Sequence, residues 1–343
     1  MKLYLVDLEP IEKRYTKQWQ EWIPTLVKKY GKKKFEIETI SGKSDGEIKS
    51  GQFLDINRTQ TYKSEQIIEI ANLFEEGKVS DGDVFLFYDG WHYGIQALRY
   101  MSQCQDINVK IYAIWHAGTY DEWDLLAQKG LGYWGANFER SLFEATDGIF
   151  SSTEFHKQLI SSTRNVPNEK IHVTGYPFSH DWLKDYDTSK KENIVVFPHR
   201  TAPEKRHDIF LEVAKKMKNS DIEFITTTDV TETKDDYYKL LAKSKVSWSG
   251  GLQETCGIST FESLWLGNIV MVPNRLSYKE MYFDMFKYEP HLDSDVDAQC
   301  EMIQFAIEHY DEYVEPIKEN AEKLKDEQGP TAVQRMLKII SEA

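Results

Sequence analysis

Short apolar runs alternate with stretches of helical periodicity along the first half of the chain. The apolar runs predict buried strands, which cover residues 3–6, 35–39, 84–87, 110–114, 148–150 and 171–174. Between them, apolar positions recur at helical spacing, for example over 17–30, 64–76 and 93–101. Strands that alternate with helices form a mainly parallel sheet with helices on both faces. The first half is therefore predicted to be one α/β domain.

The second half repeats this alternation. Its apolar runs predict strands, each followed by a helix candidate, at 194–197, 223–227, 246–248 and 269–272. A glycine and a proline after the last strand of the first half predict a linker over 175–190. Towards the end of the chain, the pattern predicts consecutive helices that separate near Pro316 and near Gly329 and Pro330.

The predicted fold is α/β, with two doubly wound Rossmann-like domains that face a cleft and with C-terminal helices. The predicted domains are 1–178 and 179–305, and the C-terminal helices cover 306–343. A chain of 343 residues with 41% hydrophobic content is large enough for two separate cores. Ligands of such sheets bind beyond the carboxyl ends of the strands, where loops and helix N-termini gather. We therefore expect the chemistry in those loops.

The net charge is strongly negative. There are 42 Lys and Arg against 56 Asp and Glu, so the formal charge is −14 at pH 7, and the whole-molecule field repels polyanions. This charge counts against a broad nucleic-acid footprint. A local basic cluster, formed by Lys28, Lys29, Lys32, Lys33 and Lys34, is a candidate phosphate contact. A solvated helix end and turn is the alternative interpretation of that cluster.

The cysteines and the N-terminal segment bear on the compartment. Cys104, Cys256 and Cys300 lie far apart and show no CxxC spacing, so neither a disulfide framework nor a zinc site is indicated. The N-terminus is typical of a strand rather than of a signal peptide. No apolar run reaches the roughly 18 residues of a membrane span. We expect a cytoplasmic protein with no membrane span.

Two cations follow the strand predicted at 194–197. Arg200 and Lys205 lie in the loop before a predicted helix. Near a helix N-terminus, the planar guanidinium, the flexible ammonium and the free backbone amides would together favour a pyrophosphate. A solvated loop with incidental charges is the alternative interpretation.

The loop after 246–248 combines glycines with two carboxylates. Gly257 lets the backbone approach a ligand closely, and Ser259 and Thr260 fit a helix start. Glu254 precedes that helix and Glu262 falls in its first turn, so both carboxylates can face one pocket beside a phosphate. Carboxylates there suit hydroxyl groups, which a sugar nucleotide offers. For Glu262 alone, a favourable partner of the helix dipole is the alternative.

These two segments together resemble a family signature. Arg200-x-x-x-Glu-Lys205 and Glu254-x7-Glu262, each at a strand-to-helix loop, resemble the donor signature of retaining GT-B glycosyltransferases of the family 4 type. Residues 194–285, which include Phe-Pro-His199-Arg200 and Gly267-Asn-Ile-Val-Met-Val-Pro, are more closely similar to the group that mannosylates queuosine in tRNA and to phage nucleobase glycosyltransferases. The resemblance implies that 1–178 is the acceptor side and that 179–305 is the donor side.

The resemblance also implies a donor and its diphosphate site. Arg200 and Lys205 would bind the diphosphate, and Gly257 and Ile258 would contribute backbone amides. The donor would be a nucleotide-sugar, either a UDP-sugar or a GDP-sugar. Neither a metal nor another cofactor is required in this fold.

Two residues are the implied catalytic groups. Glu254 would hold hydroxyls of the transferred sugar, and Glu262 would hold the ribose. His116 follows the strand 110–114 and occupies the place where related enzymes put an active-site histidine that faces the transferred sugar. The catalytic pair is thus His116 and Glu254. Without the family, a packed or surface histidine is the alternative for His116.

Further contacts to acceptor or sugar are implied at Asp89, Trp91 and Gly118, on the same rim of the first domain. Trp91 as a core residue is the alternative. The first loop, over 7–14, departs from the family because it lacks the paired glycines that many relatives place beside the donor phosphate.

The resemblance favours an acceptor hydroxyl on a modified nucleobase, in tRNA or in DNA that carries hydroxymethylcytosine. A saccharide or lipid acceptor is the enzymatic alternative, and the charge of −14 supports it. A nucleotide-sugar epimerase would use the same fold. So would a protein that binds a nucleotide sugar without transferring it.

Overall fold

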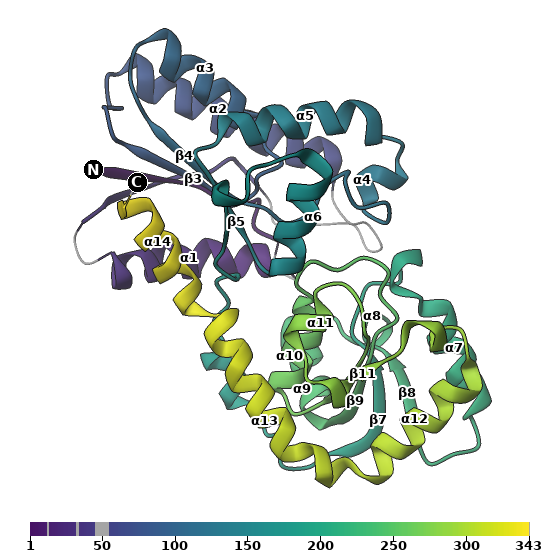
Figure 1. Ribbon diagram of the computed structural model, residues 1–343. Helices are drawn as coiled ribbons and strands as arrows, with labels where there is room; N and C mark the ends of the chain where they lie inside the picture. The colour runs from purple at the N-terminus through teal and green to yellow at the C-terminus, as the bar shows by residue number, and fades with distance from the viewer. Residues whose placement is uncertain (12–13, 32–33, 45–54, 343) are drawn as a thin grey trace. The chain divides into compact units, whose positions relative to one another are not determined.

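The computed structural model describes residues 1–11, 14–31, 34–44 and 55–342. The chain forms two compact units. The first unit contains Met1–Phe178 together with Glu327–Ala343, and the second contains Ser179–Asp326 (Figure 1). The chain therefore passes from the first unit into the second and returns to the first. The helices of the segment 306–343 are divided between the two units.

The first unit is built on a six-stranded parallel sheet in the order β2-β1-β3-β4-β5-β6. The strands are β1 (Lys2–Val6), β2 (Glu36–Ile40), β3 (Val84–Phe87), β4 (Lys110–Ile114), β5 (Gly148–Ser151) and β6 (Ile171–Val173). Because all neighbours pair in parallel, each connection must cross over the sheet, and helices supply these crossovers.

Helices lie on both faces of this sheet. They are α1 (Tyr15–Tyr30), α2 (Ile56–Glu75), α3 (Gly94–Cys104), α4 (Leu125–Gln128), α5 (Gly132–Ala145), α6 (Glu154–Arg164) and α14 (Pro330–Glu342). Figure 1 shows α2, α3 and α5 on one face and α1 with α14 on the other. The doubly wound arrangement expected from the sequence is confirmed for this unit.

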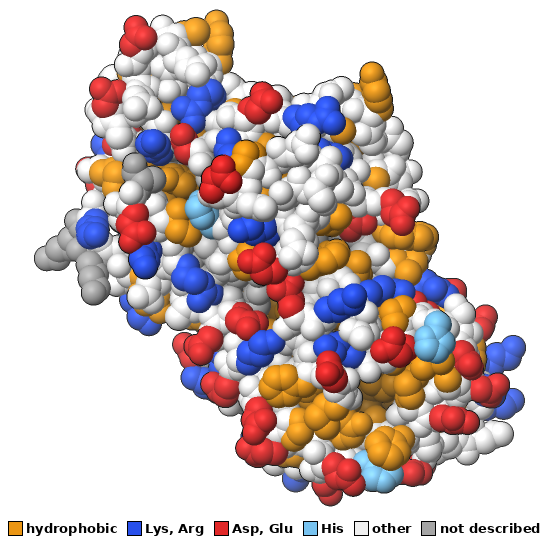
Figure 2. Space-filling view, viewed as in Figure 1, with side chains coloured by type: hydrophobic (Ala, Val, Ile, Leu, Met, Phe, Trp, Pro, Cys, Tyr) orange, Lys and Arg blue, Asp and Glu red, His pale blue; other side chains and the backbone are white. Residues whose placement is uncertain are grey.

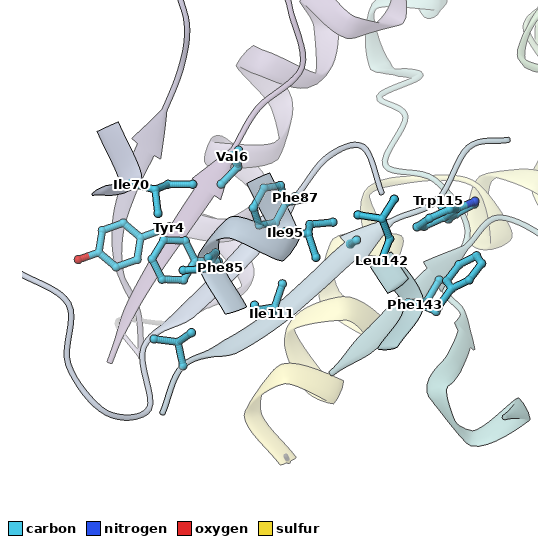
Figure 3. Packing of buried hydrophobic residues seen from close by; sticks show 14 of the residues in the cluster. Tyr4, Val6, Ile70, Phe85, Phe87, Ile95, Ile111, Trp115, Leu142 and Phe143 are labelled. Atoms are coloured by element: carbon cyan, nitrogen blue, oxygen red, sulfur yellow. The ribbon is translucent and has the colours of Figure 1, made fainter. Parts of the chain in front are cut away.

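The core of the first unit lies between the sheet and the layer formed by helices α2, α3 and α5 (Figure 3). Tyr4 stacks on Phe85 with ring centroids 4.5 Å apart, and Trp115 packs against Phe143 at 4.1 Å. These four side chains are almost entirely buried. Burial of each large apolar side chain contributes about 1.5–3 kcal/mol, so the strands are held in place up to the edge where the candidate residues begin.

The second unit contains a five-stranded parallel sheet in the order β11-β10-β9-β7-β8. The strands are β7 (Glu192–Phe197), β8 (Glu223–Thr226), β9 (Ser244–Trp248), β10 (Ile269–Pro273) and β11 (Lys287–Tyr288). All ten strands predicted from the sequence are present, and their boundaries agree to within two residues. Among the strands of the described residues, only β11 has no counterpart in the prediction, because its two residues are too short for a periodic signal.

The helices of the second unit are α7 (His207–Lys216), α8 (Thr227–Val230), α9 (Lys234–Lys243), α10 (Ile258–Trp265), α11 (Tyr278–Met281), α12 (Val296–Glu308) and α13 (Tyr310–Glu327). Short 3-10 helices of the chain are Asn168–Lys170, Asp181–Asp185, Pro203–Lys205, Asp284–Phe286 and Pro290–Leu292. The helices α7 and α10 follow β7 and β9, the two strands whose loops carry the family-like motifs.

One predicted helix boundary is wrong. Helix α13 continues through Pro316, and the preceding break lies at His309. A proline inside a helix removes one hydrogen bond and kinks the chain without necessarily ending the helix, and α1 likewise contains Pro24. The second predicted separation is confirmed, because α13 ends at Glu327 and α14 starts at Pro330.

The surface mixes both signs of charge, and hydrophobic side chains gather on one part of the second unit (Figure 2). Met285 and Phe305 are 45% and 50% exposed, and they line a groove of about 340 Å³ beside β11 and α12. In the part of the chain that the structure describes, no helix combines the length and the apolar character that crossing a membrane requires.

Candidate functional site

The two motif loops of the second unit contact each other. Lys205 ends the 3-10 helix Pro203–Lys205, and its side chain is only 9% exposed. Its Nζ donates to the Gln253 carbonyl at 2.6 Å and to Glu254 Oε2 at 3.0 Å. The Leu252 amide donates to the Glu204 carbonyl at 2.7 Å. The loops after β7 and β9, which are distant in sequence, therefore form one site at the carboxyl edge of the sheet.

Glu254 is fixed at both carboxylate oxygens. Its Oε1 accepts from the Gly257 amide at 2.8 Å, and its Oε2 accepts from Lys205. Burial is the largest single influence and disfavours the charged form, but the Lys205 charge and the hydrogen bonds from Lys205 and the Gly257 amide together hold the pKa of Glu254 below its ordinary value. Each oxygen has a second lone pair, so an ionised Glu254 can still accept hydroxyl groups from a ligand.

Gly257 turns the chain into α10. It is the N-cap residue with φ of 69°, a left-handed conformation that glycine adopts without steric cost. A Cβ at this position would lie 2.6 Å from Thr260 Oγ1. Across the described residues, the amides of Ile258 and Ser259 have no hydrogen-bond partner. These free amides at the positive end of a helix dipole form an anion-binding position.

Arg200 adds a cation that is accessible to solvent. Its side chain is 40% exposed and its guanidinium pairs with the carboxylate of Glu204. A guanidinium has five N–H donors in a planar fork, which matches the geometry of a phosphate. Arg200 and Lys205 thus differ in kind, because one is exposed and the other is buried and fully oriented.

Glu262 lies deeper than the sequence predicted. It is the fifth residue of α10, past the first turn, and it is 5% exposed. Tyr238 OH donates to its Oε1 at 2.6 Å, and Lys234 Nζ lies 3.3 and 3.4 Å from its two oxygens. Lys234 and Tyr238 share one face of α9, whose start is fixed by a capping box. Sequence reasoning missed both partners, and no short-range pattern points to them.

In the first unit, His116 directly follows β4 and uses both ring nitrogens. Its Nε2 lies 2.6 Å from the Tyr88 carbonyl and its Nδ1 lies 3.2 Å from Tyr15 OH. Since a carbonyl only accepts, Nε2 carries the proton and Nδ1 accepts from the tyrosine. Burial lowers the pKa of His116, although the Asp89 charge opposes this. The neutral ring packs against Trp19 and Tyr176 at 5.1 and 5.2 Å.

Asp89 and Trp91 follow β3 on the same edge of the sheet. Lys63 Nζ donates to Asp89 Oδ2 at 2.8 Å and to the Trp91 carbonyl at 2.7 Å. Burial would raise the pKa of Asp89, but the Lys63 charge, with the hydrogen bonds from Lys63 and the Trp91 amide, lowers it to about 2. Asp89 is therefore a carboxylate over the physiological pH range.

Gly118 and Trp91 both contact Glu139, a completely buried carboxylate that sequence reasoning missed. The Trp91 indole N–H donates to Glu139 Oε1 at 2.9 Å. A Cβ on Gly118 would lie 2.6 Å from the same oxygen and 2.5 Å from the Tyr120 ring. Gly118 is thus required for close packing around Glu139. Trp91 is partly buried and held at its polar end, while its ring packs on Phe138 at 4.8 Å.

The first loop carries buried carboxylates in place of glycines. Asp7 Oδ1 accepts from Tyr62 OH at 2.5 Å and its Oδ2 from Ser41 Oγ at 2.6 Å. Burial raises the pKa of Asp7, and these hydrogen bonds oppose the rise. Glu9 accepts from Thr59 Oγ1 at 2.8 Å. In the described part of this loop, buried carboxylates therefore stand where many relatives have glycines that expose the backbone to the donor phosphate.

The basic cluster lies at the end of α1. Lys28, Lys29 and Lys34 are exposed, whereas Lys32 and Lys33 lie outside the described residues. A separate hollow of about 770 Å³ is lined by Arg99, Asp147 and Lys170, among others. Asp147 and Lys170 immediately precede β5 and β6, so this hollow opens at the amino ends of the strands, away from the edge where ligands bind.

The described residues hold no candidate metal centre. Within residues 1–11, 14–31, 34–44 and 55–342, no group of three or more His, Cys, Asp and Glu side chains is arranged to hold a metal ion.

No protein-family model matches the chain, and no curated protein matches it. Solved structures do match. Sucrose-phosphate synthase from Thermosynechococcus elongatus is 9% identical, with a TM-score of 0.67 over 100% of this chain and 98% of that one. Anabaena HepE in complex with UDP is 12% identical, with a TM-score of 0.66 over 100% of both chains.

A mutant of S. aureus TarM, in a structure with fondaparinux, alpha-GlcNAc-glycerol and UDP, is 15% identical with a TM-score of 0.58. That match covers 81% of this chain and 59% of TarM, so this chain spans about three fifths of the TarM length. At these identities the similarity concerns the fold. The two parallel sheets with their helices have the GT-B architecture of glycosyltransferases.

Proposed function

We propose that this chain is a retaining glycosyltransferase that moves a sugar from a nucleoside diphosphate to an acceptor hydroxyl. The contact between Lys205 and Glu254 beside the free amides of α10 carries the proposal. It places a buried cation, a carboxylate and an anion-binding helix end in one site of a GT-B fold. The cation and the helix amides suit a diphosphate, and the carboxylate suits the hydroxyl groups of a sugar.

The donor diphosphate is assigned to Arg200, Lys205 and the amides around Gly257 and Ile258. Charged donors and helix N-terminal amides form stronger hydrogen bonds to phosphate than neutral donors in water do. UDP is the first nucleotide to test, because the HepE and TarM structures contain it. A GDP-sugar is the alternative donor.

The two glutamates are assigned to hydroxyl groups. Glu254 is held by Lys205 and Gly257 at the helix end, where its remaining lone pairs suit the transferred sugar. Glu262 is held by Tyr238 and suits the ribose. His116 is the proposed sugar-facing histidine of the first unit. Its Nε2 is held by the Tyr88 carbonyl, so a hydrogen bond to the sugar would require Nδ1 to exchange Tyr15 OH for a sugar hydroxyl.

The proposed chemistry breaks the bond between the anomeric carbon and the diphosphate oxygen and forms a bond to the acceptor oxygen on the same face. The leaving phosphate takes the proton of the acceptor hydroxyl. Negative charge grows on the diphosphate as the bond breaks, and Arg200, Lys205 and the α10 amides stabilise it there. Such preorganised electrostatic stabilisation is commonly the largest single contribution to catalysis.

The proposed acceptor is a hydroxyl on a modified nucleobase, in tRNA or in DNA of the hydroxymethylcytosine type. This assignment rests on the resemblance of residues 194–285. A saccharide or lipid acceptor is the alternative, and a cytoplasmic location is part of the proposal. An epimerase would release an altered sugar without any acceptor, and a binder would leave the donor intact.

Arg200→Ala tests the donor site. We expect turnover of a labelled nucleotide sugar, as transfer or hydrolysis, to fall by roughly a hundredfold or more, because one donor to the developing charge is lost. Stabilisation by UDP in a thermal-shift measurement should fall in parallel. Arg140→Ala, which removes an exposed arginine of the first unit, should change neither. Near-normal turnover of Arg200→Ala would contradict the assignment.

A further inference from the structure

His199 lies between the two motif loops and has one ring nitrogen without a partner. It follows β7 and immediately precedes Arg200, and it is 5% exposed. Its Nδ1 lies 2.9 Å from Ser259 Oγ, at the second residue of α10. Its Nε2 is buried and has no hydrogen-bond partner among the residues that the structure describes. A buried polar nitrogen without a partner is costly and rare in folded proteins.

The surroundings of the ring belong to the proposed diphosphate site. Ser259 carries one of the two free amides of α10. The charges of Lys205, Glu254 and Arg200 all act on the imidazole. The ring also packs edge-on against Phe197, with centroids 5.3 Å apart. Packing on one side and Ser259 on the other therefore fix the ring where the cations and amides converge.

The imidazole is neutral. Burial is the largest cause that lowers the pKa of His199 to about 3, and the Lys205 charge adds to it. A neutral imidazole has one N–H donor and one acceptor nitrogen. The Ser259 hydroxyl can donate to Nδ1, and the proton of the ring then resides on Nε2.

We propose that the Nε2–H of His199 donates an uncharged hydrogen bond to a phosphate oxygen of the nucleoside diphosphate, with Ser259 fixing the tautomer. This assignment rests on the proposed function. The Nε2–H group adds a hydrogen-bond donor without requiring a further charged side chain to be buried. Its protonation state also does not change near neutral pH. A donor to phosphate, rather than to the base, follows from the position of the ring beside the α10 amides and Arg200.

Two substitutions distinguish the contributions of the two ring nitrogens of His199 to binding. His199→Asn keeps a short polar group that can reach Ser259 but removes the donor at Nε2. His199→Gln places an N–H close to the position of Nε2. The exposed His291 of the same unit provides the control substitution His291→Asn. Binding of UDP and of uridine, which lacks the phosphates, would be measured by calorimetry on the full chain.

We expect His199→Asn to weaken UDP binding roughly tenfold or more, which corresponds to the loss of one hydrogen bond to a charged group. Uridine binding should stay unchanged, His199→Gln should recover most of the UDP affinity, and His291→Asn should match the unmodified chain. Equal losses for UDP and uridine, or no loss for UDP, would overturn the assignment to phosphate.

Two more measurements keep the proposal falsifiable if the His199 variants fold poorly. Ser259→Ala leaves the ring in place but frees its tautomer, so UDP binding should weaken while uridine binding stays the same; unchanged UDP binding would overturn the role of Ser259. A neutral donor also predicts that UDP affinity of the unmodified chain does not rise as pH falls from 8 to 5.5, once the titration of the phosphate of free UDP has been measured and corrected for. A rise beyond that correction would overturn the neutral donor.

Failure of this inference is distinct from failure of the proposed function. If the unmodified chain binds UDP and His199→Asn binds it equally well, only the role of His199 is wrong. If the unmodified chain binds neither UDP nor GDP, the proposed function is wrong, and the inference is overturned with it.

Discussion

Glu139 is a buried side chain that holds several segments of the first unit together. It is completely buried and pairs with Arg164 Nε at 2.7 Å. It also accepts from the Thr119 amide at 2.5 Å, from Thr119 Oγ1 at 2.9 Å and from the Trp91 indole. One carboxylate thus joins the loop after β3, the loop after β4 and α6. The orientation of Trp91 depends on it.

Glu139→Gln is expected to lower the free energy of unfolding by about 3–5 kcal/mol, because it leaves the buried Arg164 charge without its partner. Urea unfolding measures this loss. Asp181→Asn is the control, since its ion pair with Lys184 is 71% and 65% exposed and exposed ion pairs contribute little to stability. A loss for Glu139→Gln no larger than the control would show that the network contributes little.

At the residue scale, the sequence singles out side chains whose neighbours along the chain form a pattern. Arg200, Lys205, Glu254 and Glu262 were found because each follows a strand at a loop-to-helix junction. Their partners were not found. The Tyr238 hydroxyl on Glu262 and the contact of Lys205 with Glu254 join distant segments, and only the folded backbone brings these together.

At the element scale, apolar runs predicted strands well because both faces of each sheet are covered and each run is bounded by polar residues. Helix ends were less accurate, since capping and tertiary contacts set them. Lys191 is an example. Its Nζ donates to the carbonyls of Ser244 at 2.9 Å and Leu266 at 2.5 Å, which follow the ends of α9 and α10. No local sequence pattern predicts that Lys191 caps these two helices.

Lys191→Met is expected to destabilise the protein by about 1–3 kcal/mol, because buried carbonyls at two helix ends lose their donor. Chemical unfolding followed by tryptophan fluorescence measures the change. Lys190→Met alters the exposed neighbouring residue and should have an effect near zero. If the two variants unfold at the same denaturant concentration, Lys191 does not stabilise these helix ends.

At the scale of the whole molecule, the charge of −14 sets a condition on any nucleic-acid acceptor. Binding must then rely on local cations such as Lys28 and Lys29 and must release counterions. With about four phosphate contacts, the logarithm of affinity for tRNA or modified DNA should fall with the logarithm of salt concentration at a slope of about −3.6. Fluorescence anisotropy across a salt series measures it.

A double substitution of Lys28 and Lys29 by Ala should make that slope shallower by about one to two, if these residues contact phosphates. The matched control is substitution of Lys215 and Lys218, which lie in the second unit at and beyond the end of α7. Absence of measurable binding to either nucleic acid at low salt would contradict the nucleobase acceptor and favour the saccharide or lipid alternative.

The path of the chain has one more consequence. The second unit is a single uninterrupted segment, Ser179–Asp326, whereas the first unit needs Glu327–Ala343 to be complete. The second unit, which carries both motifs, is therefore joined to the first unit at two positions in the chain, after Phe178 and after Asp326. A chimera that exchanges the second unit between two related proteins must therefore keep both junctions. A single crossover near residue 178 would combine α1 of one protein with α14 of the other, although these two helices pack on each other.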